Sequence, residues 1–422
     1  MKIDLLEILR CPFCGSSLEL SETTKIDRQD DQIINGILSC QCSAYPVVDR
    51  IPVFSADYLA DQAREHLAAE EPQEALLTML GLDESSRQRA FISFLAQGSS
   101  ATYKDGVQIL CPDAEGTYFI YRFTDPTYLI GQKLLQAVGS NERCFAKRAI
   151  DLCGGSGHLT RVLCEVAGPA EVLLADAYYW KLWMAKRFNA PRCQPVCCDA
   201  NNPLPFVHDA FSLAFCSDAF HYIWSKRLLA SEMMRLVGHR GVVLLSHLHN
   251  AMVENFSAGM PLASKWWQNL FGEMKARVFK ESEVFESCLN RSFLDLTRVY
   301  RDEELADEQA LFLMASGEED VFRTYSHSDS TICGGQIYLN PLYHIEQREG
   351  SVALRLHFPS PEYEEEFGAS KRYLPERVEM TMEDFRLSQL WAQSWAQSGT
   401  LNDNIRKLLE QRVLLELPKG YL

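Results

Sequence analysis

The stretch AIDLCGGSGHLT, residues 149–160, decides the fold of this chain. Its first four residues are mostly apolar and predict a buried strand, and the glycines that follow predict a tight loop. The residues from His158 onward predict a helix. A glycine-rich loop between a strand and a helix lets a ligand approach the backbone and exposes amide groups at the start of the helix.

The sequence around this loop repeats the pattern of a strand followed by a helix. The next apolar run, residues 171–176, ends in Asp176, which lies 19 residues after Gly157. An acid at that place can accept hydrogen bonds from the hydroxyls of a ribose. Further apolar runs end near Asp199 and Ser217. Short apolar runs that alternate with helical segments predict a parallel sheet, with ligands at the carboxyl ends of its strands.

Two residues distinguish between cofactors. The dinucleotide-binding motif has a third glycine where this chain has Thr160, and Asp151 stands directly before the loop. A carboxylate there suits an amino group better than a pyrophosphate. S-adenosylmethionine carries an amino group, a ribose diol and a sulfonium and has no phosphate. The sequence therefore favours S-adenosylmethionine, with Asp199 in reach of its adenine amino group.

Residues 120–250 resemble the class I S-adenosylmethionine-dependent methyltransferases. The residues that carry the resemblance are the loop at 151–157, Asp176, the stretch 199–206, Phe211-Ser212-Leu213, and Ser217-Asp218-Ala219 with His221. Cys153 stands where this family usually has its first glycine.

The resemblance implies a set of cofactor-binding residues. They are Asp151, Cys153, Gly155, Gly157, Asp176, Ala177, Asp199, Ala200 and Ser217. Asp151 and the loop are expected to hold the methionine part, and Asp176 the ribose. Asp199 and Ala200 are expected to flank the adenine, and Ser217 to lie near the transferred methyl group.

Three histidines are candidate catalytic residues. His221 follows the fourth strand, and His247 and His249 end the fifth. Alternation along an extended segment would place His247 and His249 on one face. A neutral imidazole at the carboxyl ends of the predicted strands could remove a proton from the acceptor near neutral pH. A hydrogen-bonded structural role is the alternative for each of them.

The amino-terminal segment contains two pairs of cysteines. Cys11 and Cys14 are separated by 25 residues from Cys40 and Cys42. Four thiolates can hold a structural Zn²⁺ in a closed tetrahedral site, and a domain this small benefits from a metal. Residues 3–54 resemble the Trm112-like zinc ribbons, although the Cys-Gln-Cys pair has one spacer residue where the family commonly has two. Four unligated thiols, or a redox pair, are the alternatives.

These patterns predict four segments and one fold class. The segments are a zinc ribbon (1–54), a helical lid or connector (55–145), the methyltransferase core (146–250) and a carboxy-terminal extension that completes the sheet and shapes the acceptor site (251–422). The fold class is an α/β, doubly wound, Rossmann-like methyltransferase sheet with a small zinc ribbon and an α+β extension.

Composition narrows the functional classes. The 422 residues carry a net charge of −16, which disfavours nucleic acid as a partner. No apolar run is long enough to span a membrane, and the first ten residues do not form a signal peptide. The fourteen cysteines lie mostly in apolar runs, which is typical of a reducing cytoplasm.

We therefore expect a cytoplasmic enzyme that methylates oxygen or nitrogen of a small-molecule or glycan acceptor. A ribosomal RNA methyltransferase and a non-catalytic methyltransferase-like scaffold are the alternatives. The sequence fixes neither the acceptor nor the oligomeric state.

Overall fold

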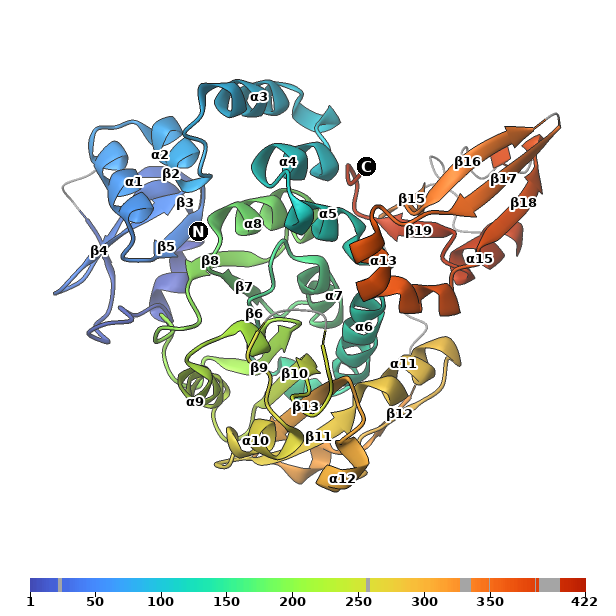
Figure 1. Cartoon of the computed structure of the whole chain (residues 1–422). Coiled ribbons are helices and arrows are strands. Elements are labelled where there is room, and N and C mark those ends of the chain that lie inside the picture. Colours follow the sequence, from blue (N-terminus) through green and yellow to red (C-terminus); the bar gives the residue numbers. More distant parts are fainter. Residues whose placement is uncertain (22–24, 256–258, 327–334, 349, 384, 387–402) are drawn as a thin grey trace. The chain divides into compact units, whose positions relative to one another are not determined.

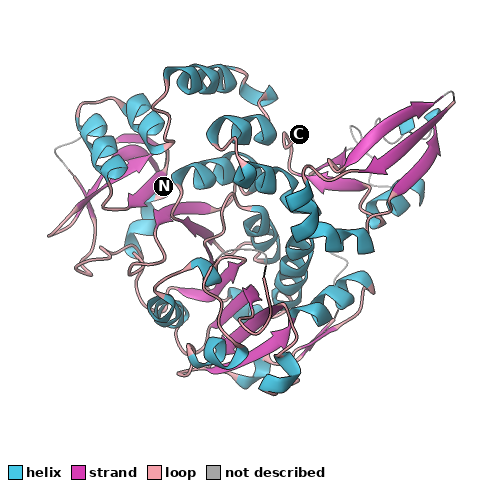
Figure 2. Ribbon diagram, viewed as in Figure 1, coloured by secondary structure: helices cyan, strands magenta, loops and turns pink. Residues whose placement is uncertain are grey.

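The computed structural model of the chain describes residues 1–422 except 22–24, 256–258, 327–334, 349, 384 and 387–402 (Figure 1). The described residues form two compact units. The first unit contains residues 1–90 and 130–328, and the second contains residues 91–129 and 329–422. Figure 2 shows the helices and strands of both.

A single twelve-stranded sheet runs through the first unit, in the order β1-β3-β4-β5-β8-β7-β6-β9-β10-β13-β11, with β2 beside β3. Its amino-terminal strands are β1 (Glu19–Leu20), β2 (Asp27–Gln29), β3 (Gln32–Ser39), β4 (Ala44–Val48) and β5 (Ile51–Phe54). Its remaining strands are β6 (Arg148–Leu152), β7 (Val172–Asp176), β8 (Gln194–Cys198), β9 (Phe211–Ser217), β10 (Val242–His249), β11 (Lys275–Lys280) and β13 (Ala310–Ser316). A separate pair is formed by β12 (Leu294–Asp295) and β14 (Thr324–Tyr325).

The central strands from β8 to β10 are parallel, and the order reverses between β6 and β9. Such a reversal is the place where open α/β sheets bind ligands. Beyond β10, β13 and β11 pair in antiparallel directions. The predicted α/β Rossmann-like fold is therefore confirmed, and the central sheet is mixed.

The amino-terminal strands belong to this same sheet. Val53 and Phe54 of β5 pair in parallel with Cys197 and Cys198 of β8. The main hydrophobic core also includes buried side chains from the amino-terminal strands and from the central parallel strands. The segment that contains the four cysteines is therefore packed as part of the first unit.

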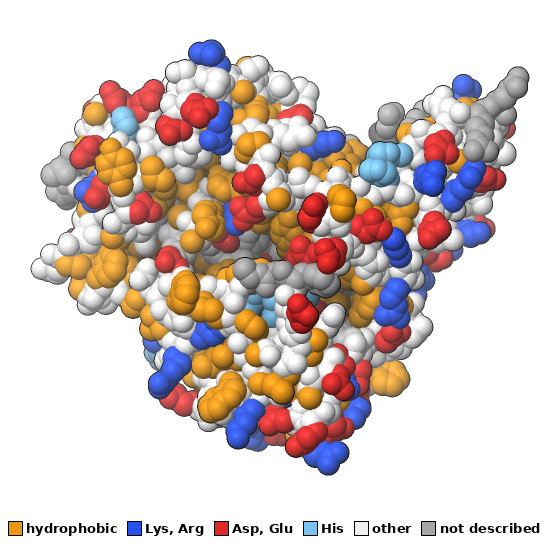
Figure 3. All heavy atoms as spheres, viewed as in Figure 1, with side chains coloured by type: hydrophobic (Ala, Val, Ile, Leu, Met, Phe, Trp, Pro, Cys, Tyr) orange, Lys and Arg blue, Asp and Glu red, His pale blue; other side chains and the backbone are white. Residues whose placement is uncertain are grey.

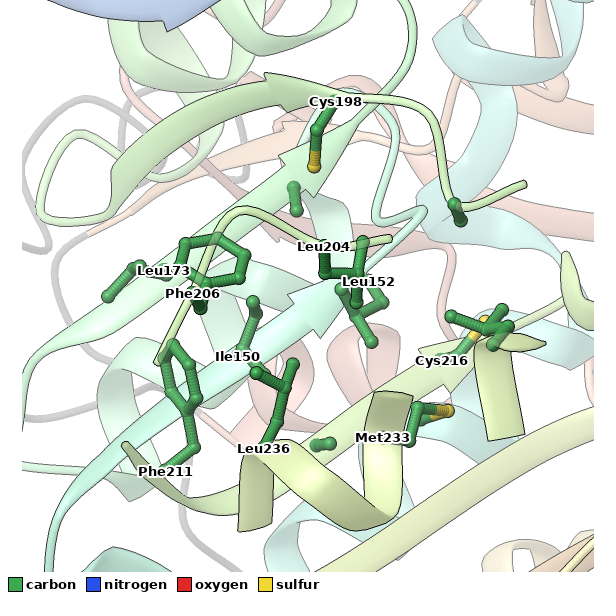
Figure 4. Packing of buried hydrophobic residues seen from close by; sticks show 14 of the residues in the cluster. Ile150, Leu152, Leu173, Cys198, Leu204, Phe206, Phe211, Cys216, Met233 and Leu236 are labelled. Carbon is green, nitrogen blue, oxygen red and sulfur yellow. The ribbon is translucent and has the colours of Figure 1, made fainter. Parts of the chain in front are cut away.

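Helix α9 (Lys226–Val237) shows how the core of this unit is built. Its residues Met233 and Leu236 are fully buried and belong to the same hydrophobic cluster as Ile150 and Phe211 of the sheet (Figure 4). Strands buried on both faces read as continuous apolar runs, which is why residues 172–176 and 194–198 were recognisable. The sheet thus forms a packed support for the loops at its carboxyl edge.

The other helices of the first unit are α1 (Tyr58–Ala68), α2 (Pro72–Met79), α7 (His158–Val166), α8 (Tyr179–Met184), α10 (Ser264–Asn269), α11 (Glu281–Leu289) and α12 (Asp302–Leu305). Helices α3 (Ser85–Ala96) and α6 (Pro126–Gly139) each begin in one unit and end in the other. Across the described part of the chain, no helix combines the length and apolar character needed to cross a bilayer.

The second unit combines helices from before the sheet with the carboxy-terminal residues. Its helices are α4 (Tyr103–Leu110), α5 (Ala114–Tyr121), α13 (Pro361–Phe367) and α15 (Asp403–Glu410). Its strands are β15 (Gln336–Leu339) paired with β19 (Leu414–Leu417), and the sheet β16 (Tyr343–Arg348), β17 (Ser351–Leu356) and β18 (Arg377–Thr381).

Aromatic contacts join the two parts of this unit. The ring of Tyr121 lies 5.7 Å from that of Tyr363, and the ring of Phe123 lies 5.0 Å from that of Tyr421. Tyr121 and Phe123, which belong to the predicted lid, are therefore packed into the second unit. The predicted domain boundaries stay predictions.

Candidate functional site

The glycine loop between β6 and α7 has left-handed backbone at several positions. Cys153, Gly155 and Gly157 have φ angles of 58°, 55° and 83°. A Cβ atom on Gly157 would lie 2.8 Å from the Cβ of Ala185, so only glycine fits there. Cys153 adopts the left-handed conformation despite its side chain, at a cost of roughly 1–2 kcal/mol.

We expect Gly157→Ala to destabilise the chain by about 2–4 kcal/mol, because left-handed strain adds to an overpacked contact. Denaturant unfolding measures the change. Gly81→Ala is the matched control, since Gly81 has φ 65° but no atom within 4 Å of its would-be Cβ. Equal losses in the two variants would contradict the close packing at Gly157.

Asp151 lies buried under the loop. Its Oδ2 accepts a hydrogen bond of 2.6 Å from Thr160 Oγ1, and a Cβ on Gly154 would lie 2.6 Å from the same oxygen. Thr160, which replaces the third glycine of the dinucleotide motif, therefore has a role of its own. It orients the carboxylate at the end of β6.

Asp176 at the end of β7 connects two loops. Its Oδ2 accepts a hydrogen bond from the Gly155 amide, and its Oδ1 accepts one from the Tyr178 amide, both at 2.9 Å. The exposed Ala177 lies between Asp176 and Tyr178, and its carbonyl accepts a bond from the Cys197 thiol. The carboxylate is thereby held against the glycine loop.

Asp199 after β8 is part of a wider network. Its Oδ1 accepts bonds from the backbone and side-chain nitrogens of Asn201. The side-chain oxygen of Asn201 in turn accepts bonds from the amides of Trp224 and Ser225, beyond β9. Ala200 is buried beside it. The exit loops of β8 and β9 are thus tied together by Asn201, which sequence reasoning missed.

The ends of β9 and β10 carry the remaining candidates. Ser246 Oγ donates a hydrogen bond of 2.8 Å to Ser217 Oγ. The register of β10 against β13 shifts between Leu245 and Leu248, so a bulge interrupts the alternation that the sequence predicted. His247 has a φ angle of 53° within this bulge.

The three candidate histidines nevertheless come together. The rings of His221 and His249 stack at 3.8 Å, and the ring of His247 lies edge-on to His249 at 5.2 Å. His247 Nδ1 lies 2.7 Å from Glu281 Oε1, and its amide donates to Glu281 Oε2. No sequence signal identified Glu281, because it begins α11 far along the chain.

Burial sets the charge of two of these rings. It lowers the pKa of His221 to about 3, with a further contribution from the neighbouring His249. Burial and the nearby His247 lower the pKa of His249 to about 4. Both imidazoles are therefore neutral at neutral pH.

The four cysteines near the amino end also converge. Their sulfur atoms all lie within 4.8 Å of one another. Cys11 is 3.6 Å from Cys42, and Cys40 is 3.8 Å from Cys42 and 3.9 Å from Cys14. Four thiolates around one zinc, with bonds of about 2.3 Å, stand about 3.8 Å apart. The short Cys-Gln-Cys pair is thus compatible with a site that could hold zinc.

Comparisons with known proteins address the central segment. Residues 149–241 match a family model described as "Methyltransferase domain". No curated protein matches the chain significantly.

Several solved structures match part of the chain. The YcgJ protein of Bacillus subtilis is 16% identical over 44% of this chain and 98% of its own, with a TM-score of 0.32. A methyltransferase of Thermotoga maritima is 12% identical over 48% and 94%, with a TM-score of 0.33. A complex of the Trm112 methyltransferase activator of Haloferax volcanii with a methyltransferase matches at 12% identity over 43% and 91%, with a TM-score of 0.32.

The family match begins at the strand that leads into the glycine loop and contains Asp176, Asp199 and Ser217. The chain therefore contains a class I S-adenosylmethionine-dependent methyltransferase domain, which includes residues 149–241.

Proposed function

We propose that this chain methylates a hydroxyl or amine of a small-molecule or saccharide acceptor. The observation that carries the proposal is the pair of carboxylates held against the glycine loop. Asp151 lies beneath Gly154, and Asp176 already binds the amide of Gly155. Two negative charges there oppose a pyrophosphate and favour an ammonium group and a sugar diol.

The residues fit S-adenosylmethionine, which supplies an activated methyl group on a sulfonium when it is bound. Asp151 and the loop from Cys153 to Gly157 would hold the amino acid part. Asp176 and Ala177 would bind the ribose, and Asp199 and Ala200 would flank the adenine. Ser217, which is hydrogen-bonded to Ser246, would lie near the transferred methyl group.

The histidine cluster supports an acceptor site at the ends of β9 and β10. We propose that His221, His247 and His249 act on the acceptor, and a general base is one role open to them. The geometry favours His247 among the three, because Glu281 fixes Nδ1 and leaves Nε2 on the side of Asp218, 3.9 Å from its Oδ1.

Nucleic acid is a less favoured acceptor class than small molecules and saccharides. The net charge is −16, and acidic and basic side chains are interspersed on the face in Figure 3. A surface of this kind repels phosphate backbones. We also propose that the enzyme is cytoplasmic and that the four clustered thiols bind a structural Zn²⁺.

Calorimetric titration tests the cofactor. We expect S-adenosylmethionine and S-adenosylhomocysteine to bind with one site per chain, and NAD⁺ not to compete with them, because its pyrophosphate would face Asp151 and Asp176. Binding of NAD⁺ in place of S-adenosylhomocysteine would refute the proposed cofactor. Absence of binding to all three would favour the scaffold alternative.

The acceptor is sought by comparing metabolites and glycans of cells with and without the gene by mass spectrometry. We expect at least one species whose mass falls by one methylene group when the gene is deleted. Hypomethylated ribosomal RNA with unchanged metabolites and glycans would contradict the proposed acceptor class.

A further inference from the structure

A second group of metal-binding side chains lies at the carboxyl ends of β9 and β10. Asp218, His247 and His249 each offer one donor atom, and these atoms all lie within 4.8 Å of one another. Within this group, Asp218 Oδ1 lies 3.9 Å from His247 Nε2. This group is separate from the thiol cluster and has different chemistry.

The spacing is close to that of a bound cation. Nitrogen and oxygen ligands lie about 2.0–2.2 Å from a transition metal, so that neighbouring ligand atoms stand about 3–3.5 Å apart. The observed donors lie within 4.8 Å of one another and would reach that spacing by rotation of their side chains. Asp218 and His247 lie on loop and bulge backbone with φ angles of 55° and 53°, and their donor atoms converge with that of His249.

Glu281 holds His247, one of the three proposed ligands, in place. Its Oε1 lies 2.7 Å from His247 Nδ1, and its Oε2 accepts the His247 amide. Glu281 is only 4% exposed. A carboxylate paired with one imidazole nitrogen fixes the tautomer, orients the ring and makes the other nitrogen a better metal ligand.

His221 provides an independent observation. It is fully buried, yet neither ring nitrogen has a hydrogen-bond partner among the residues that the structure describes. Its ring stacks on His249 at 3.8 Å, with an interplanar angle of 14°. Buried polar atoms are nearly always satisfied, so these nitrogens point to a ligand that belongs beside His249.

We propose that Asp218, His247 and His249 bind a divalent transition-metal ion such as Zn²⁺ or Mn²⁺, and that this ion binds a hydroxyl oxygen of the acceptor. Two imidazoles and one carboxylate suit these ions and leave coordination positions open. The acceptor role of the ion rests on the proposed methyl transfer, whereas its binding to the three side chains does not.

The ion would change how the acceptor is activated. A hydroxyl bound to a divalent cation ionises at lower pH, because the cation stabilises the negative oxygen. Its O–H bond breaks, the electron pair stays on oxygen, and the proton passes to bulk water. His247 then serves as a ligand and not as a base, and the acceptor class narrows from amines to hydroxyl compounds.

Mn²⁺ binding to the full chain, followed by electron paramagnetic resonance, tests the site. Mn²⁺ prefers nitrogen and oxygen ligands, so the thiol cluster does not interfere. We expect one Mn²⁺ per chain in the wild type, displaced by Zn²⁺. Asp218→Asn retains the size of the side chain, and His249→Phe retains a ring against His221. Each should weaken Mn²⁺ binding at least tenfold, and Glu281→Gln by about 10–100-fold.

The control is His208→Ala, which removes an exposed histidine before the amino end of β9 and should leave Mn²⁺ affinity unchanged. Titration with S-adenosylhomocysteine on the same samples separates the two proposals. Equal Mn²⁺ affinity in wild type and Asp218→Asn, or no binding at millimolar Mn²⁺, overturns the ion site, while binding of S-adenosylhomocysteine keeps methyl transfer. Mn²⁺ binding that depends on Asp218 in a chain that does not bind S-adenosylhomocysteine keeps the ion site and removes its acceptor role.

Discussion

Cys14→Ser and Cys42→Ser should each lower the zinc content by one ion per chain and destabilise the first unit. Apparent binding free energies of structural zinc are on the order of 10–16 kcal/mol in small zinc domains. We expect a loss of at least about 3 kcal/mol, which corresponds to a melting temperature lower by roughly 5–10 °C. Elemental analysis and thermal unfolding measure the two effects.

Because these two thiols are exposed, the experiment distinguishes loss of the metal from loss of side-chain packing. Cys14 and Cys42 are solvent-exposed, so that replacing sulfur by oxygen creates no cavity. Surface substitutions of this kind usually change stability by less than about 0.5 kcal/mol. A large loss would therefore come from the metal. Cys288→Ser, outside the cluster, is the control, and an unchanged melting temperature in Cys14→Ser would contradict a structural zinc.

The loss should spread beyond the amino-terminal strands. The Arg10 amide donates to the carbonyl of Pro205, and the Val207 amide donates to the carbonyl of Ile8. Strand β5 also pairs with β8, the strand that leads to Asp199. We expect chelation of zinc to weaken S-adenosylhomocysteine binding as well, because Asp199, the proposed adenine contact, directly follows β8.

The sequence alone predicts the strands and the glycine loop of the site. It does not predict the contacts that these elements make with residues far along the chain. Buried parallel strands read as apolar runs, and positive φ at Gly155 and Gly157 follows from their place in a tight loop. Glu281 pairs with His247 across 34 residues, and no periodicity marks such a contact. The bulge at His247 depends on pairing with β13, which lies still further along the chain.

The sequence also did not predict that residues 91–129 and 329–422 form one unit, for the same reason. Helix α5 lies within the segment predicted to be helical (55–145), but its partners lie in the carboxy-terminal residues. Tyr121 packs against Tyr363, and Tyr373 donates its hydroxyl to the carbonyl of Thr124. Side-chain packing between distant segments leaves no pattern in one sequence.

Asp176→Ala should weaken S-adenosylhomocysteine binding at least 100-fold, as measured by calorimetry. Hydrogen bonds to a charged group contribute about 1.5–3 kcal/mol each, and a ribose diol would donate two. The same carboxylate also holds the amides of Gly155 and Tyr178. Asp307→Asn, an exposed carboxylate before β13, is the control and should bind as the wild type does. A change of less than threefold in Asp176→Ala would contradict the ribose assignment.

Loss of affinity alone does not separate ribose binding from support of the loop, because Asp176 does both in our proposal. A cofactor analogue without the two ribose hydroxyls separates them. The wild type should discriminate against this analogue by about 100-fold, whereas Asp176→Ala should bind the analogue and S-adenosylhomocysteine with similar affinity, since the partner of the diol is gone. If Asp176→Ala still discriminates as strongly as the wild type, the carboxylate only supports the loop, and another residue binds the sugar.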